Sequence, residues 1–387
     1  MTDEQPPNLA LLPAGLRDLL PPDAETEASA VEQVMEIFAG HGYQRVKPPL
    51  LEFEDGLLSG SGAAMADQSF RLMDPDTHRM MAVRADMTPQ VARIATTRLA
   101  HSPRPLRLSY AGQCLRSRAT GLMPDRQLAQ AGIELIGPDS ASADAEIVAV
   151  GAEALAALGL TRISFDLTMP TLVPALLDDA EVSAEARRHL ARALDRKDAA
   201  EVATHGGSLA ATLTALLLAA GPADRALAAL DDAALPHAVR ILADRLAATV
   251  AAIQARAPGL KLTVDPVEFR GLKYHTGVCT TVYAPGRHEE LGRGGRYLCA
   301  DNEPATGLTL YPDAVLRAAP GRTAKPRVFI PLMPVSGPAG VDAPSLRAQG
   351  FATVAGLDPV ADSEAEALRL GCTHVLTEGA LRSLSAE

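Results

Sequence analysis

The sequence of 387 residues contains no tryptophan, and its aromatic residues amount to only 3%. The protein core must therefore be packed with aliphatic side chains, chiefly those of leucine, valine and alanine. Hydrophobic residues make up 47% of the chain and charged residues 21%, which is typical of a folded soluble protein. The length is sufficient for two or three domains.

Cysteine is also scarce, and the four cysteines are Cys114, Cys279, Cys299 and Cys372. They lie far apart in the sequence, and no Cys-x-x-Cys pair is present. This spacing argues against both a disulfide framework and a zinc site, which require paired ligands. We therefore expect reduced thiols and no metal ion.

The sequence has no apolar run long enough to cross a bilayer. The most apolar stretch, residues 209–220, is a dozen residues long, whereas a membrane-spanning helix needs about 20. The first ten residues are acidic and contain proline, unlike a secretory signal with a basic start and an apolar centre. We therefore expect a cytoplasmic protein with no membrane partner.

Basic residues are outnumbered, with 36 lysines and arginines against 47 acidic residues, which gives a net charge of −11. A protein that binds a nucleic-acid backbone usually carries a basic stripe, because phosphate contacts supply most of its affinity. No such stripe is evident in the sequence. The charge balance therefore argues against tRNA as a partner.

An amphipathic helix is predicted over residues 24–39. Asp23 is a favourable N-cap residue, and Gly40 ends the apolar periodicity. Positions i, i+3, i+4 and i+7 carry one apolar stripe, which consists of Val31, Val34, Met35 and Phe38. A short strand over residues 44–47 is expected to follow.

The next part of the chain is rich in predicted strands without a helix between each pair. This pattern is typical of a largely antiparallel sheet with helices on one side, an α+β fold. Residues 171–257 differ, because they are rich in alanine and leucine at helical spacing, and we interpret them as a helical insertion. The predicted strands cover residues 106–110, 128–136, 163–169, 260–269 and 277–284.

A polar segment over residues 320–326 resembles a linker. Beyond it, strands and helices alternate, which predicts a small parallel α/β module. We therefore expect two domains, residues 1–320 and residues 326–387. The predicted elements of the second domain are strands at 327–332, 351–355 and 374–377 and helices at 343–349 and 363–370.

The glycine-rich stretch over residues 292–297 lacks the spacing and the lysine of a phosphate-binding loop. It also does not open a helix after a buried strand, as a dinucleotide-binding motif does. Taken alone, it is best interpreted as a tight turn between strands.

Polar residues interrupt three otherwise apolar segments, residues 83–90, 107–134 and 269–277. A charged group on the covered face of a sheet costs several kcal/mol unless it is paired. Each polar residue taken singly could point to water or pair with a neighbour. Together they favour a polar cavity on one face of the sheet, lined by Asp86, Arg116, Gln130, Glu134 and Arg270.

Two of these segments resemble motifs of the class II aminoacyl-tRNA synthetases. Residues 107–134 resemble motif 2, and their end is similar to the histidyl-tRNA synthetase form, with Arg126, Gln127, Gln130, Gly132 and Glu134 in place. Residues 269–277 are similar to the histidine-specific Arg-Gly-Leu-Asp-Tyr-Tyr-Thr-Gly box.

Two further segments extend the resemblance. Gly294-Gly295-Arg296-Tyr297 is similar to the sequence that precedes motif 3 in that family, and residues 47–52 are similar to the motif 1 strand of its dimer interface. The resemblance covers residues 10 to 317 in the family's order. It implies a class II synthetase-like antiparallel sheet flanked by helices, and a homodimer formed through the motif 1 region.

The resemblance also implies a pocket for free histidine. Asp86, Thr88 and Gln130 would hold the α-ammonium group, Glu134 would accept a hydrogen bond from the imidazole, and Arg270 would lie near the carboxylate. These residue types suit that ligand, because carboxylates bind ammonium groups and guanidinium groups bind carboxylates. The complete implied set is Asp86, Thr88, Arg116, Gln130, Glu134, Arg270, Tyr274, His275 and Tyr297.

The chain departs from the family where ATP would bind. The motif 2 sequence Arg-x-Glu-Arg reads Arg116-Ser117-Arg118-Ala119, and the Gly-Leu-Glu-Arg of motif 3 aligns with Tyr311-Pro312-Asp313-Ala314. His275 also replaces the second tyrosine of the histidine box. Each lost phosphate contact removes on the order of 3 kcal/mol of transition-state stabilisation, so we expect no catalytic residues, no cofactor and no aminoacylation.

A histidine pocket without an ATP site resembles the synthetase paralogues that serve as regulatory subunits of ATP phosphoribosyltransferase. That resemblance implies a short-form catalytic subunit as partner, a hetero-octamer, and histidine as feedback effector in the first step of histidine biosynthesis. Two alternatives remain at this point, an active histidyl-tRNA synthetase and another amino-acid-binding paralogue with a different partner. Fold similarity alone does not separate them.

Overall fold

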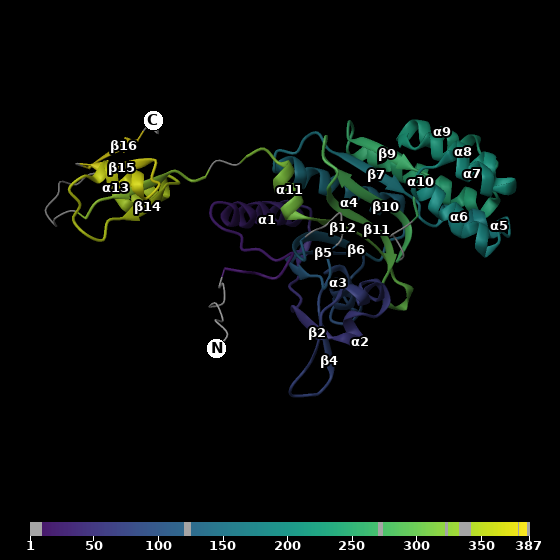
Figure 1. The fold of residues 1–387 in the computed structure, drawn as a ribbon, viewed down its shortest axis with the longest axis horizontal. Helices are drawn as coiled ribbons and strands as arrows, with labels where there is room; N and C mark the ends of the chain where they lie inside the picture. The colour runs from purple at the N-terminus through teal and green to yellow at the C-terminus, as the bar shows by residue number, and fades with distance from the viewer. Residues whose placement is uncertain are drawn as a thin grey trace, which may run out of the picture. The chain divides into compact units, whose positions relative to one another are not determined.

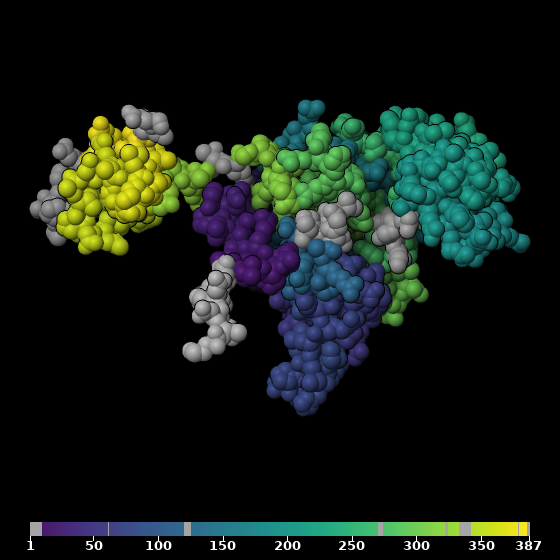
Figure 2. All heavy atoms as spheres, in the orientation of Figure 1, coloured from purple at the N-terminus to yellow at the C-terminus, as the bar shows by residue number. Residues whose placement is uncertain are grey.

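The computed structural model describes residues 10–119, 125–269, 274–321, 324–332, 342–377 and 379–384. The chain divides into two compact units, residues 1–320 and residues 321–387. Figures 1 and 2 show the first unit in purple to green and the second in yellow.

A largely antiparallel sheet forms the centre of the first unit (Figure 1). Its strand order in the described residues is β1-β5-β6-β12-β11-β10-β7-β9-β8, and only the pairs β1–β5 and β7–β9 are parallel. The α+β fold predicted from the sequence is thus confirmed. The strands are β1 (Gln44–Arg45), β5 (Leu106–Leu115), β6 (Gln127–Ile136), β7 (Ser164–Thr168), β8 (Gly221–Pro222), β9 (Lys261–Asp265), β10 (His275–Tyr283), β11 (Glu290–Leu298) and β12 (Pro304–Leu310).

The two faces of the sheet are covered differently. Successive side chains of a strand point to opposite faces, and on β6 this places Ile133 in the larger hydrophobic core and Glu134 on the other face. The larger core packs the sheet against helices α1 (Asp23–Gly40), α4 (Ala141–Ala157), α10 (His237–Arg256) and α11 (Pro312–Ala318). The opposite face carries a smaller core with helix α3 (Thr88–Thr96).

Helix α1 buries Ala30, Val34, Met35 and Phe38, close to the stripe predicted for this helix. The prediction of Asp23 as N-cap residue is wrong. Pro22 occupies the N-cap position, and Asp23 is the first helical residue with no side-chain cap bond. Its carboxylate lies in the first turn, where it still interacts favourably with the positive end of the helix dipole.

The prediction of a tight turn over residues 292–297 is also wrong, since these residues lie inside strand β11 and pair with β10 and β12. The glycines allow β11 to pack closely against its neighbouring strands and do not form a turn. A Cβ atom on Gly294 would lie 2.1 Å from the backbone oxygen of Gly307. Gly295 has a φ of +148° and is packed against Cys279.

Most of residues 171–257 is helical. The segment contains α5 (Leu172–Asp179), α6 (Ala184–Asp195), α7 (Ala199–His205), a 3-10 turn η2 (Gly207–Leu209), α8 (Ala210–Ala219), α9 (Ala223–Asp232) and α10, with the two-residue strand β8 between α8 and α9. Ser183 and Asp198 cap α6 and α7 through their side-chain oxygens. Such caps satisfy backbone N–H groups that a helix start leaves without partners.

A second small sheet carries the motif 1 region, with the order β2-β4-β3. Its elements are β2 (Leu51–Phe53), α2 (Glu54–Leu57), the 3-10 segment η1 (Gly60–Gln68), β3 (Arg71–Met73) and β4 (Met80–Val83). A further 3-10 turn, η3 (Ala300–Asn302), joins β11 to β12.

The second unit alternates strands and helices: β13 (Arg327–Ile330), α12 (Ala343–Ala348), β14 (Ala352–Ala355), α13 (Ser363–Arg369), β15 (His374–Thr377) and β16 (Ala380–Ser383). Strand β13 pairs in parallel with β14 and β15, whereas β16 is antiparallel to β15. The sequence did not predict β16, because three of its four residues are exposed and it shows no clear alternation.

In the described part of the chain, no helix combines the length and the apolar character that a membrane span requires. The four cysteines are buried free thiols. Among the described residues, no group of three or more histidine, cysteine or acidic side chains is arranged to hold a metal ion.

Candidate functional site

The centre of the candidate site is Glu134, which is 1% exposed in the middle of strand β6. Three hydroxyl groups donate hydrogen bonds to its carboxylate: Thr88 Oγ1 at 3.0 Å, Tyr297 Oη at 3.0 Å and Tyr110 Oη at 3.3 Å. Gly307 of β12 leaves space for this carboxylate, because a Cβ atom there would lie 1.8 Å from Glu134 Oε2.

Burial raises the pKa of Glu134 to about 8, although the hydrogen bonds from Tyr297 and Thr88 oppose this shift. The negative charge of Asp86 adds to the increase. An ionised carboxylate in a closed site needs partners, and the hydroxyl groups supply them only partly. A ligand N–H group directed at Glu134 would therefore stabilise its charged form.

This pKa predicts a pH dependence of stability. The folded-state pKa of Glu134 lies above the unfolded value of 4.5. Between pH 4.5 and 8 the folded protein therefore keeps a proton on Glu134 that the unfolded chain has already lost. The free energy of unfolding should therefore fall with rising pH in this range, by at most about 1.4 kcal/mol per pH unit from this group. Urea unfolding at several pH values should show that component in the wild type and its loss in Glu134→Gln. Identical pH profiles for both proteins would contradict it.

A second polar cluster lies beside Glu134 where helix α3 begins. Asp86 Oδ1 accepts a hydrogen bond from the backbone N of Thr88 at 2.8 Å, and Asp86 Oδ2 accepts one from Gln130 Nε2 at 2.9 Å. Gln130 in turn accepts hydrogen bonds from Met87 N at 3.0 Å and Cys114 Sγ at 3.2 Å. Asp86 is only half-buried, so its carboxylate is held in place and stays partly accessible.

Aromatic rings from the start of β10, from the residue before it and from β11 line the same site. The rings of Tyr274 and His275 stack with centroids 4.0 Å apart, and Tyr274 meets Tyr297 edge-on at 6.2 Å. Burial and the nearby carboxylates of Asp86 and Glu134 raise the pKa of Tyr274 well above its usual value. His275, at the position of the family's second tyrosine, thus keeps an aromatic ring stacked in the site.

Of the two arginines in the predicted set, the structure describes only Arg116. Arg270 lies outside the described residues. Arg116 follows strand β5, and its backbone N donates to the carbonyl oxygen of Arg126 at 2.7 Å. Its charge lowers the pKa of Tyr311, which burial and Asp86 raise to about 12. Arg116 and Asp86 therefore lie within electrostatic reach of the same phenol.

The sequence interpretation missed three residues of the site: Tyr110, Thr309 and Tyr311. Tyr110 donates to Glu134, and its hydroxyl lies 2.7 Å from Thr309 Oγ1. Tyr110 fits the apolar alternation of its strand, so its hydroxyl group went unnoticed. The sequence did offer a signal, because the alternation places Tyr110 at a buried position and a buried tyrosine hydroxyl requires a polar partner.

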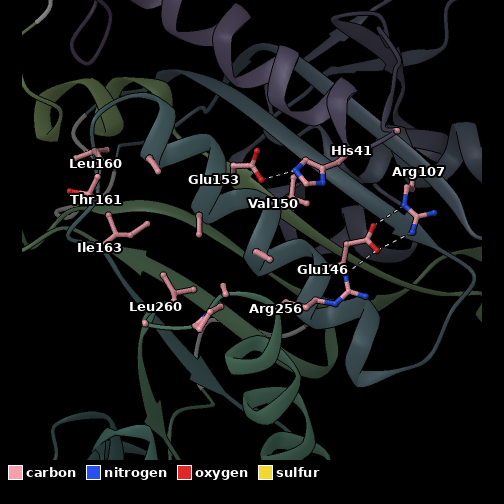
Figure 3. A pocket seen from close by; sticks show the side chains of 17 residues that line it. His41, Arg107, Glu146, Val150, Glu153, Leu160, Thr161, Ile163, Arg256 and Leu260 are labelled. Atoms are coloured by element: carbon pink, nitrogen blue, oxygen red, sulfur yellow. Dashed lines mark hydrogen bonds and ion pairs between the residues drawn. The ribbon is translucent and has the colours of Figure 1, made fainter.

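A different cavity, of about 800 Å³, lies along the outer face of α4 (Figure 3). Arg107 binds Glu146 through Nε at 2.7 Å and Nη2 at 2.9 Å, and His41 Nε2 lies 2.8 Å from Glu153 Oε2. These charged groups thus have partners within the protein.

Comparison with known proteins shows the family of the chain. The family model for histidyl-tRNA synthetase matches residues 15–315. The ATP phosphoribosyltransferase regulatory subunit of Gluconobacter oxydans is 55% identical over 98% of both chains. That of Paramagnetospirillum magneticum is 56% identical over 95% of this chain and 96% of its own. The chain belongs to the ATP phosphoribosyltransferase regulatory subunits, a histidyl-tRNA synthetase-like family.

A solved structure has a similar fold over most of the chain. The structure from Bacillus halodurans, described as an ATP phosphoribosyltransferase regulatory subunit/histidyl-tRNA synthetase, superposes with a TM-score of 0.78 at 24% identity. It covers 94% of this chain and 97% of its own. The relatives at high identity bear the name of a regulatory subunit and not that of a catalyst, and the resemblance inferred from the motifs is confirmed.

Ala314, which the motif resemblance aligns with the motif 3 arginine of synthetases, is buried in this chain. Ala314 is 3% exposed and packs in the larger core. Its neighbour Asp313 accepts hydrogen bonds from Arg17 Nη2 at 2.9 Å and from the backbone N of Ala129 at 3.2 Å. The side chains at the start of α11 are therefore already in contact with other residues of the protein.

Proposed function

We propose that this chain is the regulatory subunit that a short-form ATP phosphoribosyltransferase catalytic chain requires for activity. In this role it binds free L-histidine, and histidine binding inhibits the first step of histidine biosynthesis. The observation that carries the proposal is the buried polar cluster around Glu134. It lies in a chain that has Ala119 and Ala314 where the motif resemblance places two ATP-binding arginines.

The pocket suits histidine at each end of the ligand. Asp86, held by Gln130 and the Thr88 backbone, is a fixed acceptor for the ammonium group. Glu134 is the acceptor for the imidazole N–H. Arg116, together with Arg270, provides positive charge for the carboxylate, since guanidinium groups bind carboxylates with two hydrogen bonds.

We further assign residues 1–320 to a synthetase-like domain with a helical insertion at 171–257, and residues 326–387 to a C-terminal α/β domain. The assembly we propose is a cytoplasmic hetero-octamer that contains homodimers formed through motif 1 and binds no tRNA. An apolar groove of about 570 Å³ next to that motif, lined among others by Pro49, Leu51 and Phe53, supports the homodimer. Leu50 beside it is 51% exposed.

Replacing Glu134 by alanine should weaken histidine binding about tenfold or more. A hydrogen bond to a charged group contributes roughly 1.5–3 kcal/mol, and the variant also leaves three hydroxyl groups without their acceptor. Isothermal titration calorimetry of histidine into the wild type and Glu134→Ala measures the difference.

Glu153→Ala is the matched control, because it removes a carboxylate from the cavity of Figure 3 instead of from the pocket. Its histidine affinity should equal that of the wild type. Equal affinities for Glu134→Ala and the wild type, or weaker binding only in Glu153→Ala, would disprove the site assignment.

A further inference from the structure

Helix α10 forms a groove with the sheet face opposite the histidine pocket. The groove has a volume of about 600 Å³ and lies at the start of strand β10 and the end of β11. We call it the α10 groove, and the residues that matter for its chemistry are Ile241, Leu242, Asp244, Thr276, Arg296 and Leu298.

The floor of the α10 groove is a partly buried ion-pair network. Arg296 is 5% exposed and donates from Nη2 to Asp144 Oδ1 at 2.7 Å. Arg245 of α10 donates to Asp144 Oδ2 at 3.2 Å and to Asp139 Oδ1 at 3.0 Å. The two guanidinium groups are thus paired with carboxylates of the protein, and removing one partner of the buried pair Arg296–Asp144 would be strongly destabilising.

The accessible part of the α10 groove is apolar and acidic. Ile241 is 55% exposed and Leu298 is 39% exposed, so both present aliphatic surface to the solvent. Asp244 is exposed and adds negative charge, whereas Asp139, whose side chain is 63% exposed, is paired with Arg245 at 3.0 Å and with Arg296 at 3.3 Å. Apolar side chains bordered by negative charge favour an occupant that carries an aliphatic side chain next to lysine or arginine.

The same strands also form the histidine pocket. On β11, Arg296 lies in the α10 groove and the next residue, Tyr297, donates to Glu134. On β10, Thr276 lines the groove and its neighbour His275 lies in the pocket. Because adjacent residues of a strand point to opposite faces, an occupant of the groove would contact the backbone that positions the pocket.

We propose that the α10 groove is a docking surface for the catalytic chain, which inserts a short segment of aliphatic and basic side chains. This inference rests on the proposed function, because it takes the catalytic chain as the partner. A second copy of this chain is a poorer occupant. A symmetric contact would place the same patch on both copies and bring the exposed Asp244 carboxylates of the two copies together.

The test is the affinity between the full-length chain and the short catalytic chain, measured by surface plasmon resonance. Ile241→Arg places a bulky positive charge in the α10 groove and should weaken binding at least about tenfold, as at the centre of an interface. Leu218→Arg is the matched control. Leu218 is also exposed, at 65%, but it lies on α8 outside the groove, so its affinity should stay within about twofold.

Asp244→Lys gives a second test that does not depend on apolar contact. It should weaken binding at low salt and reduce the salt dependence seen with the wild type, because exposed charges are screened by salt. Ile241→Arg and Asp244→Lys proteins that bind as tightly as Leu218→Arg would overturn the docking surface. Failure of the wild-type chain to bind the catalytic chain would instead overturn the proposed function.

Discussion

Histidine-dependent exchange of pyrophosphate into ATP should remain at background for the purified chain, and no tRNA should be charged. By the motif resemblance, Ala119 and Ala314 stand where the synthetase family has two arginines that contact ATP phosphates. Each such donor is worth on the order of 3 kcal/mol in the transition state, so two losses amount to roughly 6 kcal/mol. This corresponds to about four orders of magnitude in rate.

The structure adds that one substitution should not restore the activity. Ala314 lies on the buried face of α11 in the larger core, and its neighbour Asp313 accepts a hydrogen bond from Arg17. An arginine side chain does not fit at the packed position 314, and overpacking of a core typically lowers the free energy of unfolding by about 1–3 kcal/mol. Ala314→Arg should therefore stay at background and lose stability.

The exchange assay needs an authentic histidyl-tRNA synthetase as positive control, measured at equal protein concentration. Exchange above background by the wild-type chain would show that the phosphate contacts are supplied by other residues. The regulatory role would then have to coexist with synthetase chemistry.

Much of the fold could be predicted because it depends on local pattern. The four-residue spacing of Gln130 and Glu134 places both on one face of β6, whereas Ile133 points into the opposite core. The stripe of α1 could be predicted in the same way from the period of 3.6 residues.

The remainder depends on pairing between distant strands. Gly294 and Gly295 suggested a turn, but they are required by the close approach of β10 and β12. Tyr110 and Thr309 meet at 2.7 Å although 199 residues separate them in the sequence. Strand register sets such contacts, and no local period in a single sequence reveals it.

Histidine should inhibit a complex reconstituted from this chain and the short catalytic subunit, and inhibition should depend on Glu134. The pocket has no reaction of its own to serve, so its occupancy matters only if it changes the reaction on another chain. Coupling between two sites is reciprocal and typically amounts to about 1–3 kcal/mol, a factor of roughly 5 to 150. Histidine should lower the affinity for the phosphoribosyl substrate by such a factor, and the substrate should lower the affinity for histidine equally.

The most direct test measures histidine inhibition of complexes that contain the wild-type chain, Glu134→Ala or the control Glu153→Ala. Inhibition is expressed relative to the activity of each complex without histidine. We expect inhibition at similar histidine concentrations for the wild type and Glu153→Ala, and at concentrations at least about tenfold higher for Glu134→Ala. Unchanged inhibition in a Glu134→Ala complex whose regulatory chain no longer binds histidine would place the feedback site on another surface and leave this chain as an activator only.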